Sequence, residues 1–312
     1  MRIRSRLLGV GAGVALAALA LTGCSTDPAP ADGGKAAPAA DEGTFAKDAD
    51  TLVFVVLPDH EGSDQDAEPI ADYIAEITGK KVEFFEATDY TAAIQALASG
   101  QADIGQISAF TYYQSKNAGA DISPIGAQIT KEGAEPGYYS VAIKNPASSA
   151  SSLADFADQP VCFVNPESTS GFLIPNSQLL KAGVTVPEDK QVFGEKHPAT
   201  AALVAEGAQC QVGFAQDIDA DPLIASGQLE EVDRYLVPAA PIVLQNALPQ
   251  DVKDALFAGL QGSTQKSLTD KGIELNDFLL NGWFGFGAVD DAYYDTITAV
   301  CEQLPDVEAC KA

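Results

Sequence analysis

The chain is poor in the residues that most metal sites and nucleic-acid-binding surfaces use. It has two histidines and five cysteines, and none of them lies in a CxxC or HExxH spacing, so the sequence carries no zinc motif. It has 18 lysines and arginines against 44 aspartates and glutamates, a formal net charge of -26. Because a protein with this large negative charge repels polyanions, we expect no nucleic acid as a partner. We also expect no metal ion and no cofactor.

The rest of the composition is typical of a folded protein. Of the 312 residues, 46% are apolar and 20% are charged. The chain is therefore too hydrophobic to be disordered throughout, and it is long enough for about two domains with cores of their own.

The N-terminal segment has the parts of an export signal. The first six residues carry three arginines, Leu7 to Leu21 contains no charge, and small residues precede Cys24. This pattern predicts a signal peptide over residues 1–23, too short to span a bilayer comfortably. Its ending, Leu-Thr-Gly-Cys, resembles the lipobox of bacterial lipoproteins, which implies a lipid on Cys24. An ordinary signal followed by a chance cysteine is the alternative.

The lipobox resemblance also implies a location. We expect an exported protein that the lipid on Cys24 anchors to the outer face of the cytoplasmic membrane. Residues 24–50 are rich in Pro, Gly, Ala and Asp and have almost no large apolar side chain. They predict a disordered tether that holds the folded part off the membrane.

Four cysteines remain after the anchor, an even number in an exported protein. Three pairings are open. We favour disulfides between Cys162 and Cys210, on two strands of one lobe, and between Cys301 and Cys310, around a short C-terminal loop. Free buried thiols are the alternative.

From Thr51 onward, strand-like apolar runs alternate with helical patterns. Leu52 to Leu57 is a buried strand, a helix follows behind Pro69, and the cycle starts again with the strand Val161 to Val164. This alternation predicts an α/β fold on largely parallel sheets, built as two similar lobes. We expect lobe 1 to comprise residues 51–143 and 238–312, and lobe 2 to comprise residues 144–237.

The two chain crossings between these lobes, at Lys144 and Val237, imply a hinge. In such folds a ligand usually binds in the cleft, where strands end and helices begin.

A cluster of hydroxyls lies at one such junction. Ser168, Thr169 and Ser170 precede Gly171, between a predicted strand and a helix whose main part should start near Pro175. Side-chain hydroxyls and exposed backbone N–H groups at a helix start can hold a tetrahedral oxyanion. A simple N-cap is the competing interpretation.

Three further side chains could join this site. His197 precedes Pro198, which places the imidazole at the N-terminus of the next helix and at the same end of the lobe. Tyr90 begins a helix in the first lobe, and Tyr112 lies past a strand of that lobe; either phenol could donate to an oxyanion. A solvated histidine and half-buried packing tyrosines are the alternatives.

With these residues in place, the sequence resembles the phosphonate/phosphate/phosphite family of ABC-transporter substrate-binding proteins, over residues 51 to about 300. The specific feature is PESTSGFLIP, Pro166 to Pro175, with a later histidine. Supporting segments are Thr78 to Gly105, ISAFTYY at the place of the family's glycine-proline-aromatic-tyrosine motif, Val192 to Gly207 and Tyr235 to Leu260.

The resemblance implies a two-lobed type II periplasmic-binding-protein fold of the α/β class, with a hinge of two chain crossings. The ligand would be a small phosphorus oxyanion, namely phosphate, phosphite or an organic phosphonate. The residues that match the family's ligand-binding positions are Ser168, Thr169, Ser170, His197 and Tyr90, and Tyr112 matches a tyrosine near the cleft. The implied protein is no enzyme; it is a monomer that delivers its ligand to a permease and an ATPase.

The sequence departs from the family pattern at two places. Gln211 stands where many members have an Asp in the strand after the histidine-led helix, and Ser108 with Ala109 replaces the glycine and proline. A neutral amide accepts a proton from P–OH, or pairs with an amine, more weakly than a carboxylate does. We include Gln211 among the expected ligand contacts.

Two other functions remain open at this point. A phosphoester hydrolase could use Ser168 or Ser170 as nucleophile and His197 as base, although no G-x-S-x-G elbow is present. A lipoprotein of the same fold could act as a sensor or an adhesin.

Overall fold

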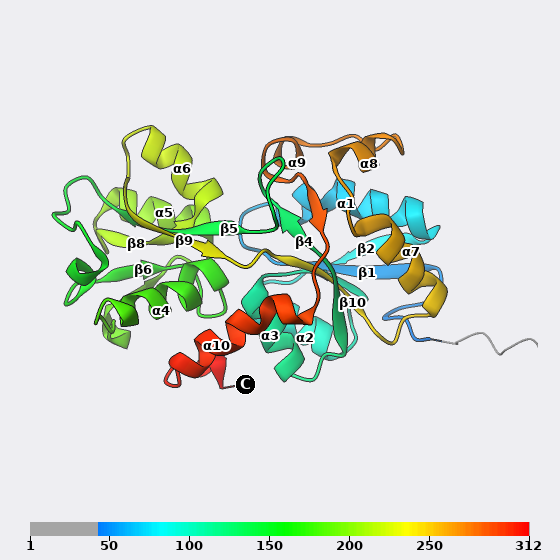
Figure 1. The fold of residues 1–312 in the computed structure, drawn as a ribbon, viewed down its shortest axis with the longest axis horizontal. Coiled ribbons are helices and arrows are strands. Elements are labelled where there is room, and N and C mark those ends of the chain that lie inside the picture. The colour runs from blue at the N-terminus through cyan, green and yellow to red at the C-terminus, as the bar shows by residue number, and fades with distance from the viewer. Residues whose placement is uncertain (1–42, 312) are drawn as a thin grey trace, which may run out of the picture. The chain divides into compact units, whose positions relative to one another are not determined.

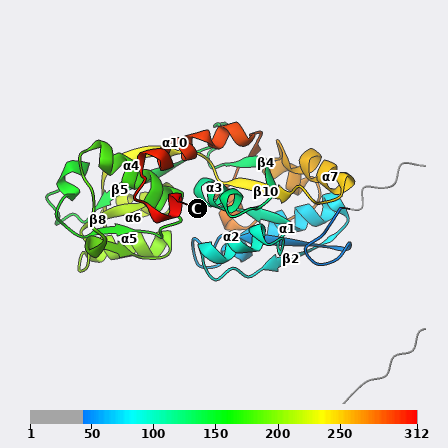
Figure 2. The ribbon, with the colours of Figure 1, turned by 90° about the horizontal axis from the view of Figure 1, so that it is seen from below.

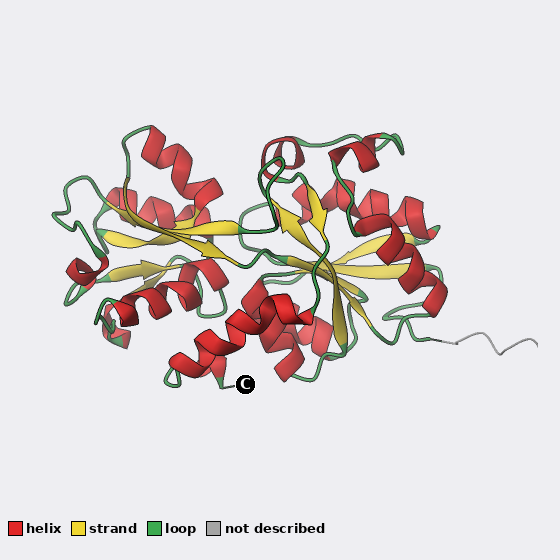
Figure 3. Ribbon diagram, in the orientation of Figure 1, coloured by secondary structure: helices red, strands yellow, loops and turns green. Residues whose placement is uncertain are grey.

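A computed structural model describes residues 43–311. The predicted signal, the lipid anchor at Cys24 and most of the tether lie outside these residues. The described part is an α/β fold with one six-stranded and one five-stranded sheet, each flanked by helices (Figures 1 and 3). We call the part with the six-stranded sheet lobe 1 and the other lobe 2. Within residues 43–311, no helix combines the length and apolar character needed to cross a membrane.

Lobe 1 has the strand order β11-β4-β10-β3-β1-β2, and β1 runs parallel to β2 and β3. Its strands are β1 (Thr51–Val56), β2 (Lys81–Phe85), β3 (Ile104–Gln106), β4 (Ile122–Ile129), β10 (Pro241–Gln245) and β11 (Gly285–Gly287). Its helices are α1 (Ser63–Thr78), α2 (Tyr90–Ala98), α3 (Ala109–Asn117), α7 (Gln250–Leu260), α8 (Gln265–Thr269), α9 (Asp277–Gly282) and α10 (Asp295–Gln303).

The alternation of side chains along β1 explains why both faces of this sheet are covered. Leu52 and Phe54 belong to the core cluster that includes residues of α1 and α7. Val55 belongs to the cluster that includes residues of α2 and α3. Since successive strand residues point to opposite faces, a continuous apolar run gives a strand buried on both sides.

Lobe 2 has the strand order β7-β6-β8-β5-β9. Its strands are β5 (Tyr138–Lys144), β6 (Val161–Phe163), β7 (Gln191–Phe193), β8 (Val212–Gln216) and β9 (Glu230–Val237), and its helices are α4 (Ile174–Lys181), α5 (His197–Glu206) and α6 (Asp217–Ala225). Figure 1 shows α5 and α6 on one side of this sheet and α4 on the other.

Two expectations about the chain path need correction. We placed the first crossing at Lys144, but β5 pairs with β8 and β9, so the chain enters lobe 2 before Tyr138. The second crossing follows Val237, where we expected it, because β10 returns to the first sheet. We also expected a helix behind Pro69, whereas α1 begins at Ser63 and includes Pro69. A proline removes one backbone N–H from a helix, and the long buried face of α1 outweighs that loss.

The C-terminal helix α10 contacts α3 of lobe 1 and α4 of lobe 2, as Figure 2 also shows. Both cysteine pairs favoured from the sequence are adjacent. The Cα atoms of Cys162 and Cys210 are 5.8 Å apart, and those of Cys301 and Cys310 are 5.2 Å apart.

Candidate functional site

A cavity of about 690 Å³ receives side chains from both lobes. Its walls form where strands end and helices begin, as in other α/β proteins. Polar side chains from both lobes line it, among them Asp59, His60, Asp66 and Tyr90 from lobe 1 and Tyr138, Ser168, His197 and Gln216 from lobe 2.

The hydroxyl loop, which we define as Ser168 to Ser170, follows β6. Residues Thr169–Leu173 form a turn of π-helix, a conformation that is frequent at functional sites. Ser168 is its N-cap, and the Ser168 hydroxyl accepts a 3.0 Å hydrogen bond from the Gly171 N–H. A Cβ at Gly171 would lie 2.3 Å from a methyl carbon of Val164, so only glycine fits there. Helix α4 then begins with Pro175 in its first turn, as predicted.

The other two hydroxyls are fully buried. The Thr169 oxygen accepts a 2.8 Å hydrogen bond from the Phe110 N–H, an otherwise orphaned donor in the first turn of α3. This leaves the Thr169 O–H free to donate. The Ser170 hydroxyl lies 3.5 Å from Nε2 of His197.

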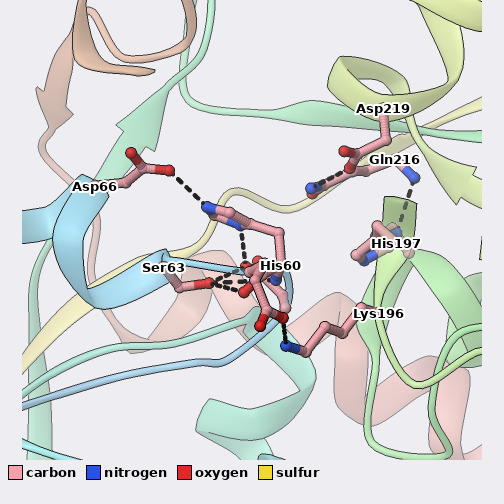
Figure 4. A network of polar contacts seen from close by, with 10 residues as sticks. His60, Ser63, Asp66, Lys196, His197, Gln216 and Asp219 are labelled. Carbon is pink, nitrogen blue, oxygen red and sulfur yellow. Dashed lines mark hydrogen bonds and ion pairs between the residues drawn. The ribbon is translucent and has the colours of Figure 1, made fainter. Parts of the chain in front are cut away.

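His197 is held as a neutral donor at the start of α5. Its Nδ1 accepts a 3.0 Å hydrogen bond from the backbone N–H of Gln216 (Figure 4). The proton of the neutral ring is therefore on Nε2, which faces Ser170. Burial lowers the pKa of His197 to about 4, against the opposing charge of Asp59. The ring is therefore neutral at physiological pH.

Two phenols complete the donor set. Tyr90 is the first residue of α2, where the Asp89 side chain caps the helix by accepting the Ala92 N–H at 2.8 Å. Tyr138 begins β5 and was missed by the sequence analysis, because nothing local separates it from the exposed Tyr139. Burial raises the pKa of both Tyr90 and Tyr138 well above the ordinary value, and the charge of Asp59 adds to the rise, so both remain O–H donors.

Four predicted ligand contacts are not among the residues that line this cavity: Thr169 and Ser170, which are fully buried, and Tyr112 and Gln211, which lie elsewhere. The Tyr112 hydroxyl donates to the carboxylate of Asp291, which Lys116 also contacts at 2.8 Å, on another side of α3. Gln211 is exposed at the start of β8, away from the strand's carboxyl end. The residue at that end is Gln216, whose side chain donates to Asp219 at 2.7 Å. Ser108 does line the cavity, as the N-cap of α3.

The sequence analysis also missed a charged group in lobe 1. His60 lies 2.7 Å from Asp59 and 2.8 Å from Asp66, and Figure 4 shows it beside Ser63. Burial alone would lower the pKa of His60, but the hydrogen bond and charge of Asp59, with those of Asp66, raise it to about 9. A signal was available, because Asp59 comes two residues after Leu57, where the apolar run that we assigned as a buried strand ends.

The arrangement suits binding better than hydrolysis. A serine nucleophile needs a histidine nitrogen that accepts its proton. Here the nitrogen beside Ser170 carries the proton, because Gln216 occupies the other one. Among residues 43–311, no group of three or more His, Cys, Asp or Glu is arranged to hold a metal ion.

The chain is similar in sequence to a known protein family. Residues 54–294 match the family described as "ABC transporter, phosphonate, periplasmic substrate-binding protein". The chain is 32% identical over 287 residues to the "Phosphate-import protein PhnD" of Mycolicibacterium smegmatis, covering 84% of this chain and 88% of that protein. It is 29% identical over 192 residues to the "Phosphonates-binding periplasmic protein" of Escherichia coli, covering 57% of this chain and 55% of that protein.

Solved structures share the fold. A binding protein component of an ABC phosphonate transporter from Pseudomonas aeruginosa superposes with a TM-score of 0.67 at 22% identity, covering 84% of this chain and 97% of that chain. PhnD1 from Prochlorococcus marinus in complex with methylphosphonate superposes with a TM-score of 0.66 at 19% identity, covering 82% of this chain and 98% of that chain.

Proposed function

Because the chain belongs to the family of periplasmic substrate-binding proteins of phosphonate ABC transporters, we propose that six neutral donors hold a phosphorus oxyanion, four that line the cavity and two that follow Ser168 in the chain. As a member of this family, the chain is the solute-binding component of an ABC importer for phosphonate or phosphate, and it binds rather than catalyses. The proposed donors are Tyr90, Tyr138, Ser168, Thr169, Ser170 and His197.

The observation that carries this proposal is the fixed tautomer of His197. The backbone N–H of Gln216 donates to Nδ1 of His197, so the ring carries its proton on Nε2, which faces the hydroxyl loop with or without a ligand. Hydrogen bonds to a charged partner are worth roughly 1.5–3 kcal/mol each. Four or more of them, less the cost of immobilising the ligand, are enough for about -8 kcal/mol, a micromolar affinity.

We further propose that the two lobes close over the ligand. Two contacts join the lobes beside the site. The backbone N–H of His197 donates to the backbone carbonyl of Asp59 at 3.1 Å, and the Lys196 side chain forms an ion pair with Glu61. The closed form would be the one that the permease and its ATPase receive.

The finer features of the exported protein are also proposals. We propose that a lipid on Cys24 anchors the chain to the outer face of the cytoplasmic membrane, that the protein acts as a monomer, and that both cysteine pairs form disulfides. Support for the disulfides comes from the short Cα–Cα distances and from the oxidising environment of exported proteins.

Calorimetric titration tests the binding site. The mature chain, with Cys24→Ser and freed of bound ligand by unfolding and refolding, is titrated with phosphate, phosphite and methylphosphonate. We expect one-to-one binding that Ser168→Ala weakens by roughly 10-fold or more, since a donor to a charged ligand is lost. Ser177→Ala is the matched control, because Ser177 is buried in α4 outside the cavity. Equal binding by Ser168→Ala and wild type would contradict the proposal.

A further inference from the structure

An ionised carboxylate lies among the neutral donors. Asp59 comes just after β1 at the end of the sheet where the cavity forms, and it lines the cavity. Its side chain retains 30% of its surface exposed. Asp59 lines the cavity together with Tyr90, Tyr138 and His197, and its backbone carbonyl accepts the backbone N–H of His197 at 3.1 Å, so the carboxylate lies near the groups proposed to hold the ligand.

The two oxygens of this carboxylate differ in their surroundings. Oδ1 accepts from the Ser63 hydroxyl at 3.1 Å and pairs with Nδ1 of His60 at 2.7 Å. Within residues 43–311, no hydrogen bond reaches Oδ2. Asp66 holds the other ring nitrogen of His60 at 2.8 Å, so the imidazolium fixes the orientation of Asp59. The charge of His60 keeps the pKa of Asp59 below its usual value although burial alone would raise it.

Two cations also line the cavity: the His60 imidazolium, which Asp59 and Asp66 hold by both ring nitrogens, and Lys131. Asp66 lies on α1, and Asp217 and Asp219 lie on α6 across the cavity, where burial raises the pKa of both. Glu61 and Lys196 pair with each other. Asp59, whose backbone carbonyl accepts the backbone N–H of His197, therefore places an acceptor-only oxygen, Oδ2, beside the neutral donors.

We propose that Oδ2 of Asp59 accepts a hydrogen bond from a P–OH group of the ligand, so that the site selects hydrogen phosphate over oxyanions that carry no proton. The inference rests on the proposed function and adds to it the substrate class. An ionised carboxylate can only accept. Beside an oxyanion without a proton it leaves two facing negative charges, whereas beside P–OH it forms a short charge-assisted hydrogen bond.

Two comparisons between ligands isolate this contact. Sulfate has the shape of phosphate and no proton at neutral pH. Methylphosphonate loses its only P–OH when it becomes a dianion slightly above neutrality, whereas phosphate as a dianion still keeps one. At about pH 8.5 the two phosphorus ligands therefore carry equal charge and differ in the P–OH group alone.

The first test replaces the acceptor. Asp59→Asn keeps the shape of the side chain and turns one oxygen into a donor. In calorimetric titrations of the mature chain, we expect phosphate to bind roughly 10- to 100-fold more weakly and sulfate to gain affinity. Asp64→Asn is the matched control, because it removes one carboxylate from the first turn of α1 outside the cavity and leaves His60 and Oδ2 of Asp59 unchanged, so it should retain the wild-type preference. An unchanged phosphate-to-sulfate ratio in Asp59→Asn would overturn the inference.

The second test needs no variant and remains valid if Asp59→Asn fails to fold. The binding of phosphate and of methylphosphonate to wild-type protein is measured at about pH 6 and about pH 8.5. Phosphate is the control, because a change in the protonation of the protein's own groups affects the binding of both ligands. We expect the affinity for methylphosphonate to fall roughly 10-fold or more relative to the affinity for phosphate at the higher pH. A constant ratio of the two affinities would refute the role of Asp59. If wild type bound no oxyanion at either pH, the proposed function itself would fail, which is a different result.

Discussion

The chain has two histidines, and the structure gives their pKa values opposite shifts. Burial outweighs the charge of Asp59 and lowers the pKa of His197 to about 4. Contact with Asp59 and Asp66 raises the pKa of His60 to about 9 in spite of burial. We therefore predict that neither imidazole titrates near 6.5, the ordinary value.

Both shifts contribute to stability, in different pH ranges. The raised pKa of His60 stabilises the folded state fully below pH 6.5, and this contribution is lost as the pH rises toward about 9. The lowered pKa of His197 has the opposite effect, since the folded state loses stability as the pH falls from 6.5 to about 4. Each difference corresponds to about 3 kcal/mol at the end of its range, taken as an upper limit.

An NMR titration of the imidazole C–H signals measures this directly. A tag-free mature chain should give two resolved signals, and His60→Gln and His197→Gln assign them. The free energy of unfolding of His197→Gln against wild type, measured from pH 7 to about pH 4, should differ by a pH-dependent amount that approaches 3 kcal/mol. The comparison with the variant is needed because burial also raises the pKa of Asp219 to about 6, which shifts stability in the opposite direction over this range.

Two outcomes would refute the reasoning. If the His197 signal titrated near 6.5, the ring would not be a neutral donor fixed by Gln216. If the His60 signal did so, the pairing with Asp59 and Asp66 would be absent, and the orientation argued for Asp59 would lose its basis.

Two further predictions concern the framework of the site. Replacing both Cys162 and Cys210 by Ser should lower the free energy of unfolding by about 4 kcal/mol, and replacing both Cys301 and Cys310 by Ser should lower it by about 3 kcal/mol, because the first pair closes the longer loop. Denaturant unfolding with and without reductant checks both values. Equal stability of the reduced and the oxidised protein would contradict them. Gly171→Ala places a Cβ against Val164 and should weaken phosphate binding in calorimetry with a fold retained by circular dichroism, whereas Gly183→Ala, at an open turn, should leave binding unchanged.

The parts of the site that could be predicted from the sequence are those fixed by local structure. Ser168 to Ser170 lie between a strand and a helix that Pro175 begins, and His197 lies at a helix start next to Pro198. Such positions follow from capping and proline geometry, which depend on neighbours in the chain. Tyr90 is of the same kind, since Asp89 caps its helix.

The parts that could not be predicted depend on tertiary structure. Tyr138 and Tyr139 are adjacent in β5, and their burial is decided by which face of the strand meets the other lobe. Gln211 was named because the bounds of β8 could not be determined from the sequence; the strand ends at Gln216, which is the residue that lines the cavity. The Tyr112 phenol points at Asp291, a residue far along the chain that no local pattern connects to it.

The most direct test of the central claim is a crystal structure of the mature chain with phosphate bound. We predict the phosphate in the cavity between the lobes, with oxygens within about 3 Å of the Ser168 hydroxyl, Nε2 of His197 and the Tyr138 phenol. A phosphate bound elsewhere, or one that leaves Nε2 of His197 without contact, would contradict the account.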